Sequence, residues 1–122
     1  MARYDKYDPV SGGFRARLAA SVAAGEVGKI VGYGLDSNGR AVVGDGATGV
    51  LGVVIVNEVK NAGDIVDCMT AGEIVDLPGT MGVGDRFYAA ADGSLNTTST
   101  NTPVGHTTDD GRLVVRVTPK AV

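Results

Sequence analysis

The sequence is poor in the residues from which most metal and catalytic sites are built. Its 122 residues include one cysteine, one histidine and no tryptophan. A lone cysteine cannot form an internal disulfide, and a zinc site needs more Cys and His ligands than this chain provides. Nucleophilic catalysis pairs a nucleophile with a base, and the obvious candidates are Cys68 and His106. We expect an inert, core-facing Cys68 and an ordinary exposed or hydrogen-bonded His106, hence no enzyme, no cofactor and no metal.

Long apolar segments and an excess of basic charge are also missing. No apolar run approaches the roughly 20 residues of a membrane span, and the N-terminus lacks the basic-then-apolar order of a signal peptide. The formal net charge of −3 argues against nucleic acid as the main partner, because phosphates are bound by basic stripes. We therefore expect a soluble protein, made in the cytosol, that binds neither a membrane nor nucleic acid directly.

Glycine, by contrast, is abundant, with 19 residues against two phenylalanines and four tyrosines. A core of valine and other aliphatic residues on closely spaced backbones, with many tight turns, is typical of β structure. Strand-like runs separated by turn residues lie at 14–18, 27–35, 41–43, 50–56, 65–69, 74–77, 86–89, 103–106 and 112–117. The sequence predicts one all-β domain over 14–122, a small barrel or sandwich of about eight or nine short, mostly antiparallel strands.

Several of these segments carry more detail. The run 14–18 alternates as a strand does, although a short helix also fits its spacing. The run 50–56 is almost continuously apolar, which is typical of a central strand covered on both faces. The run 112–117 alternates with Leu113, Val115 and Val117 inward. The Thr-rich stretch 95–101 is either an edge strand or a loop, and Asp-Ser-Asn-Gly at 36–39 predicts a hairpin turn.

A five-residue phrase, Gly-acid-Ile-Val-Asp, occurs at 63–67 and again at 72–76. The link between the copies is too short for a helical crossover, so we predict an antiparallel hairpin. The best register sets Met69 against Ile74 and Asp67 against Asp76, because cross-strand partners share a face. The core face is then formed by Val66, Cys68, Val75 and Leu77. The opposite face is formed by Ile65, Asp67, Met69, Ile74 and Asp76.

Like charges directly opposite each other on a sheet are mildly destabilising, so Asp67 and Asp76 need a partner. The pair is suited to sharing a proton, binding a cation, or acting as acid and base. Alternatively, the carboxylates pair with arginines from other strands, for which the candidates are Arg86, Arg112 and Arg116. A neighbouring subunit that covers the apolar rim of this face could supply the same charge.

The stretch 44–49 matches the dinucleotide-binding pattern G-x-G-x-x-G. That pattern works by placing a pyrophosphate on the N-terminus of a following helix. Here a strand is expected to follow, so we interpret the stretch as a surface turn.

Residues 1–13 show neither a helical nor a strand period and are predicted to be an extended arm. Half of the tyrosines lie there, and amphipathic aromatic side chains can stack on the surface of a neighbour. A frayed terminus is the alternative interpretation. If the arm binds a partner, the candidate contacts are Arg3, Tyr4, Lys6, Tyr7 and Pro9.

Several phrases of the chain also occur together in a known family. They are Asp-Pro-Val-Ser-Gly-Gly-Phe-Arg-Ala-Arg-Leu at 8–18, the repeated phrase at 63–67 and 72–76, Gly-Asp-Arg-Phe-Tyr-Ala-Ala-Ala-Asp-Gly at 84–93, Val-Gly-His at 104–106 and Arg-Leu-Val-Val-Arg-Val at 112–117. In these phrases the sequence resembles the small capsid decoration (cement) proteins of tailed bacteriophages. The resemblance spans nearly the whole chain, and it consists of turn-and-strand phrases with no catalytic signature.

The resemblance implies a non-enzymatic protein on the outer capsid surface of the virion, which clamps neighbouring major capsid protein subunits together. It also implies a homotrimer and an N-terminal arm that adds to capsid-protein sheets. We therefore expect residues 1–13 to bind the capsid and the face around Ile65 and Met69 to contact a neighbouring subunit. The main alternative is a head-fibre or adhesin component that binds host-surface glycans, and a small hydrolase comes third.

Overall fold

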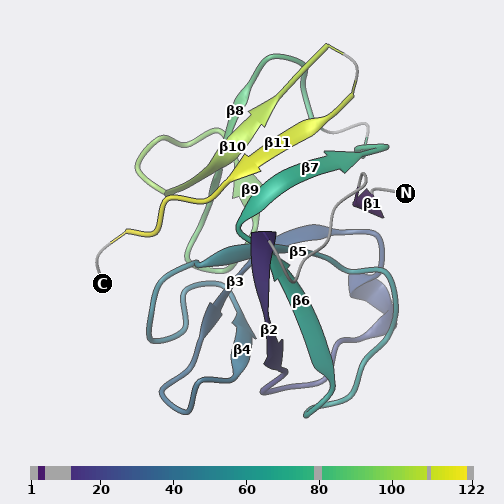
Figure 1. The fold of residues 1–122 in the computed structure, drawn as a ribbon, viewed down its shortest axis with the longest axis vertical. Coiled ribbons are helices and arrows are strands. Elements are labelled where there is room, and N and C mark those ends of the chain that lie inside the picture. The colour runs from purple at the N-terminus through teal and green to yellow at the C-terminus, as the bar shows by residue number, and fades with distance from the viewer. Residues whose placement is uncertain (1–2, 5–11, 79–80, 110, 121–122) are drawn as a thin grey trace.

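The computed structural model describes residues 3–4, 12–78, 81–109 and 111–120. These residues form eleven strands and one short 3-10 helix, η1 (Ala24–Glu26). The strands build two open antiparallel sheets that pack face to face (Figure 1). The all-β prediction is confirmed, and of its two forms the structure is the sandwich. None of the described helical residues forms a segment long and apolar enough to cross a membrane.

The six-stranded sheet lies at the top of Figure 1, in the order β1 (Arg3–Tyr4), β7 (Ala71–Val75), β11 (Leu113–Arg116), β10 (Thr102–Thr107), β8 (Arg86–Ala89) and β9 (Leu95–Asn96). The five-stranded sheet lies below it, in the order β2 (Gly13–Arg17), β6 (Ile65–Met69), β5 (Gly52–Ile55), β3 (Ile30–Leu35) and β4 (Ala41–Val43). β1 was not predicted, because two residues are too few to give a pattern. β9 is an edge strand at the start of the stretch 95–101, as one of the two alternatives for that stretch proposed.

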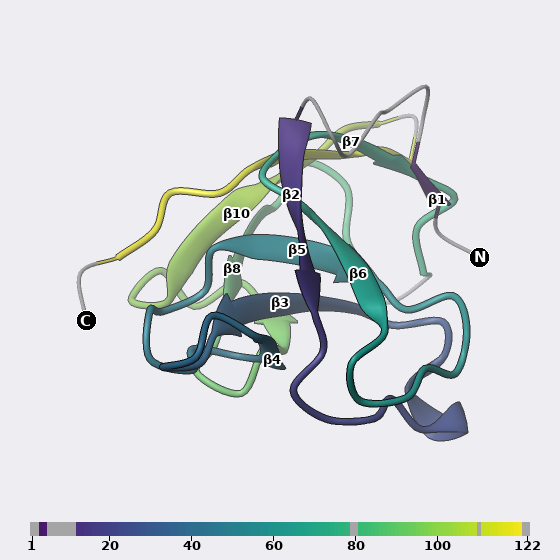
Figure 2. The ribbon, with the colours of Figure 1, turned by 60° about the horizontal axis from the view of Figure 1, so that its bottom comes forward.

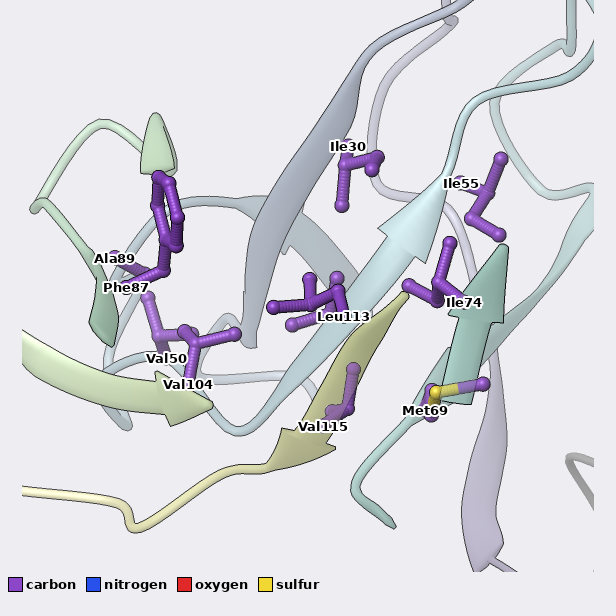
Figure 3. Close-up of a cluster of buried hydrophobic side chains, with 11 residues drawn as sticks. Ile30, Val50, Ile55, Met69, Ile74, Phe87, Ala89, Val104, Leu113 and Val115 are labelled. Atoms are coloured by element: carbon purple, nitrogen blue, oxygen red, sulfur yellow. The ribbon is translucent and has the colours of Figure 1, made fainter. Parts of the chain in front are cut away.

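The main core fills the space between the two sheets (Figure 3). Strands alternate their side chains between two faces, so β11 buries Leu113 and Val115 completely or nearly so, at 0% and 2% exposure. The prediction for these two residues is confirmed. The full cluster consists of Ile30, Val50, Val53, Ile55, Met69, Ile74, Phe87, Ala89, Val104, Leu113 and Val115. Each of these side chains larger than alanine stabilises the fold by about 1.5–3 kcal/mol through its removal from water.

A second apolar cluster covers the other face of the five-stranded sheet. It includes Tyr33 from β3 and Val54 from β5, with Leu18 and Val22 from the segment after β2 packed on them. Figure 2 shows β2 crossing in front of β5 and β3. The five-stranded sheet is therefore covered on both faces, which explains the continuous apolar run at 50–56. The expectation of a central strand there is confirmed.

The predicted hairpin between the two copies of the repeated phrase is wrong. β6 pairs with β2 and β5, whereas β7 pairs with β11 and β1, so the copies belong to different sheets. Only Thr70 separates the two strands, and the common hairpin turns have at least two residues. The N–H and the hydroxyl of Thr70 each donate to the carbonyl of Gly12 at 2.9 Å, which fixes the chain where it crosses between sheets.

Other local predictions are confirmed in part. The Asp36 carboxylate accepts hydrogen bonds from the N–H groups of Asn38 and Arg40, both at 2.9 Å, and so closes the predicted turn between β3 and β4. The run at 14–18 is a strand, β2, and not a short helix. β2 begins at Gly13, one residue inside the predicted arm. Of the arm's other residues, 1–2 and 5–11 lie outside the described part of the chain.

Candidate functional surfaces

The predicted subunit-contact face contains two residues that are not on the surface. Met69 and Ile74 are both 0% exposed and lie in the core between the sheets (Figure 3). Met69 is the residue of β6 that belongs to the core between the sheets, whereas Ile65 at the other end of the strand is 51% exposed. Met69 and Ile74 therefore cannot touch a neighbour unless the sandwich opens. Ile65, Asp67 and Asp76 remain accessible, and their contact with a neighbouring subunit stays a prediction.

The two carboxylates of the repeated phrase do not oppose each other. Asp67 lies in β6 directly across from Arg15 in β2, and the Arg15 Nε donates to the Asp67 Oδ1 at 2.7 Å. Both side chains are partly exposed, so the ion pair stabilises the fold by about 0–1 kcal/mol. Arg15 is thus a partner of Asp67 that the sequence analysis did not name.

Asp76 ends β7 in the left-handed backbone region, at φ 55°. Asp is among the few non-glycine residues that adopt this conformation readily, so it suits a turn that ends a strand. Asp67 lies in β6 of one sheet and Asp76 directly follows β7 of the other, so the predicted cross-strand pair of carboxylates is not formed. The described residues also contain no group of three His, Cys, Asp or Glu side chains arranged to hold a metal ion.

The described part of the predicted arm adds a strand to the chain's own sheet. Arg3 pairs with Val75 and Tyr4 with Ile74, so β1 extends the edge of β7 (Figure 1). The remaining candidate arm contacts, Lys6, Tyr7 and Pro9, lie outside the described residues. Binding of the arm to a capsid stays a prediction.

The two candidate catalytic side chains lie apart. Cys68 is 0% exposed in β6, and burial, assisted by the negative charge of Asp67, raises the pKa of its thiol to about 12. The thiol is therefore protonated and inert at neutral pH. His106 is exposed on β10, in the other sheet. The stretch 44–49 joins β4 to β5 as a turn with no helix after it, so no dinucleotide-binding unit is present there.

A hollow of about 160 Å³ opens over the second apolar cluster, with Tyr33, Val22 and Val66 in its wall. Burial raises the pKa of Tyr33, so its phenol is neutral. The Lys60 ammonium at the rim lies 3.1 Å from the Glu58 carboxylate and donates to the Ile65 carbonyl at 3.1 Å. The charge at the edge of this hollow is thus paired within the chain.

The feature that sequence reasoning missed is a shallow hollow of about 500 Å³ on the outer face of the six-stranded sheet. We call it the basic groove, and it is lined by Arg86, Tyr88, Pro103, Gly105, His106 and Arg116. In the sequences of β8, β10 and β11, these residues alternate with the buried ones, which is the pattern that could have indicated the groove. The alternation shows which residues point outward, but only the strand order brings the three strands side by side.

Comparison with known proteins gives a likeness in fold. No protein-family model matches the chain, and no curated protein matches it either. A solved chain described as "Mycobacterium phage Patience" is similar to it with a TM-score of 0.89 at 20% sequence identity. The match covers 99% of this chain and 98% of that chain. At 20% identity this similarity shows that the two chains share a fold along nearly their whole lengths.

Proposed function

We propose that the chain is a non-enzymatic structural protein of a bacteriophage virion. It binds the outer surface of the head and stabilises it by bridging neighbouring major capsid protein subunits. The observation that carries the proposal is the fold shared over 99% of the chain with the Mycobacterium phage Patience chain. The resemblance of the sequence to capsid decoration proteins points to the same role.

The described surfaces support a binding role over a catalytic one. Cys68 is buried with a raised pKa, and His106 lies on the other sheet, so these two side chains form no nucleophile and base pair. Two closely packed apolar clusters support such a role, because dense cores have low compressibility and a bridge between two subunits must resist deformation. As a homotrimer, it would combine several weak contacts with the capsid into one strong attachment.

In this proposal residues 1–13 attach the protein to the capsid, with Arg3, Tyr4, Lys6, Tyr7 and Pro9 as contacts. Within the described residues, β1 pairs with the edge of β7 at two positions. So short a pairing is easily exchanged for pairing with an exposed strand of another protein, which is a common mode of peptide recognition. The arm would thus leave β7 and add to a capsid-protein sheet.

The test is co-sedimentation of the purified protein with phage heads that lack it. The full chain should pellet with the heads and raise the temperature at which they open. Deletion of residues 2–12 should remove most of the binding, whereas Arg40→Gln, an exposed change far from the arm, should not. Circular dichroism checks that the deletion variant keeps its sheets.

Unchanged binding by the deletion variant would contradict the assignment of the arm. Failure of the full chain to bind heads would contradict the proposed function itself. Binding to host-surface glycans in place of heads would instead support a head-fibre or adhesin role. Light scattering of the purified chain tests the homotrimer separately, since a monomer at every concentration would exclude it.

A further inference from the structure

The basic groove has no role in the fold or in the proposed attachment by the arm. It lies on the solvent face of the six-stranded sheet, over β8, β10 and β11, which are neighbours in that sheet. Its volume of about 500 Å³ is enough for several residues of an extended chain.

Strand geometry brings the basic side chains of the groove together. In β8, Phe87 and Ala89 point into the core, so Arg86 and Tyr88 point outward. Arg86 pairs across the sheet with His106 of β10, and Tyr88 pairs with Pro103. Arg116 follows the buried Val115 of β11 and is likewise exposed.

Part of the lining of the groove is backbone that carries no side chain, at Gly105. Gly105 lies at an irregularity in the pairing of β10 with β8, opposite Val115 of β11. A Cβ atom on Gly105 would fall 1.9 Å from the carbonyl oxygen of Val114, so no side chain fits at this position. Gly105 thus leaves backbone without a side chain in the lining of the groove, which it shares with Arg86 and Arg116.

The two arginines of the groove have no ion pair or hydrogen bond within the described residues, unlike Arg15 with Asp67 or Arg112 with Glu73. The chain as a whole is acidic, with a formal net charge of −3. Unpaired guanidinium groups on one face of an acidic protein form a local site for anions. Arginine is well suited to binding anions, because its planar guanidinium group can donate two parallel hydrogen bonds to one carboxylate.

We propose that the basic groove binds an extended acidic segment of a partner protein. Aspartate or glutamate carboxylates of the segment pair with Arg86 and Arg116, and its backbone lies over Gly105 between them. Tyr88 and Pro103 contribute apolar contact along the segment, with the tyrosine hydroxyl free to donate a hydrogen bond. A polyphosphate chain fits less well, since it would extend beyond these few cations onto an acidic surface.

The experiment is fluorescence anisotropy with a labelled ten-residue oligo-glutamate, carried out at low salt. Oligo-glutamine of the same length is the uncharged control, and single-stranded DNA of equal charge is the competing class of ligand. The variants are Arg86→Gln, Arg116→Gln and their double, with Arg40→Gln as the matched control. Arg40 is also exposed, but it lies in the turn between β3 and β4.

The protein should bind oligo-glutamate and not oligo-glutamine, and added salt should weaken the binding. Each groove variant should bind about fivefold more weakly and the double about 25-fold, as expected for exposed ion pairs. Arg40→Gln should stay within about twofold of the unchanged chain. All three arginines are exposed, so the thermal midpoint should not change.

Equal binding by the groove variants and the Arg40 variant would overturn the proposal. Tighter binding of DNA than of oligo-glutamate would overturn the choice of partner. A change of oligomeric state caused by the groove variants would show that a second copy of this chain occupies the groove instead. None of these outcomes depends on binding to phage heads, so the inference and the proposed function are tested separately.

Discussion

Ile65 and Ile74 occupy the same place in the two copies of the repeated phrase, yet the fold gives them opposite environments. Ile65 is 51% exposed at the start of β6, whereas Ile74 is 0% exposed in the core between the sheets. We predict that Ile74→Ala destabilises the fold strongly and that Ile65→Ala hardly affects it. The two variants remove the same atoms, so their difference measures the environment alone.

The size of the effect follows from burial. Replacing a fully buried isoleucine by alanine costs about 2–5 kcal/mol, because apolar contacts are lost and a cavity remains. Ile74 contacts a cluster with residues from both sheets, which limits how far the site can collapse. A change at a half-exposed position away from such features stays within about 0.5 kcal/mol. A domain of this size has a total free energy of unfolding of about 5–15 kcal/mol, so the Ile74 variant should remain folded in the absence of urea.

Urea denaturation followed by circular dichroism is the assay. The midpoint for Ile74→Ala should fall by about 1–2 M urea, and that for Ile65→Ala should stay close to the unchanged chain. Equal small losses for both variants would refute the two-sheet arrangement. They are the result expected if both isoleucines lay on one exposed face of a hairpin.

Three further predictions test other parts of the fold. Met69→Lys should prevent folding, because it buries a charge at a 0% exposed position, whereas Met69→Leu should cost less than about 1.5 kcal/mol of stability. Circular dichroism distinguishes the two variants, and a folded lysine variant would contradict the placement of Met69 in the core. Gly105→Ala should lower the free energy of unfolding by about 2 kcal/mol or more, because the added Cβ would overlap the Val114 carbonyl. In Gly25→Ala the added Cβ meets nothing within 4 Å, so this control should hardly change the thermal midpoint. Folding raises the pKa of Cys68 from 9.0 to about 12, so the thiol contributes stability that is complete below pH 9 and is lost as the pH rises toward 12. Urea titrations from pH 8 to 11 should therefore show a steeper loss for the unchanged chain than for Cys68→Ala, and parallel curves would contradict this.

Local patterns in the sequence predicted local structure well. The alternation of Leu113 and Val115 predicted their burial, and the residue types of Asp-Ser-Asn-Gly at 36–39 predicted the turn that the Asp36 carboxylate closes. The continuous apolar run at 50–56 gave a strand buried on both faces. In each case the information lies within a few residues of the chain.

The arrangement of strands into sheets could not be predicted in the same way. Alternation shows that β6 and β7 each have a buried face, but not that the chain changes sheet at Thr70. The Arg15 to Asp67 pair joins residues 52 positions apart, and many other arginines would have satisfied the same charge. The basic groove depends in the same way on the order of β8, β10 and β11 in the sheet.

The most direct test of the central claim is electron cryomicroscopy of phage heads, prepared with and without the protein. The account predicts additional density on the outer surface of the head, present only with the protein, into which the two-sheet sandwich fits. This density should contact at least two neighbouring major capsid protein subunits. Heads that look identical in the two preparations, or density confined to a fibre, would contradict the account.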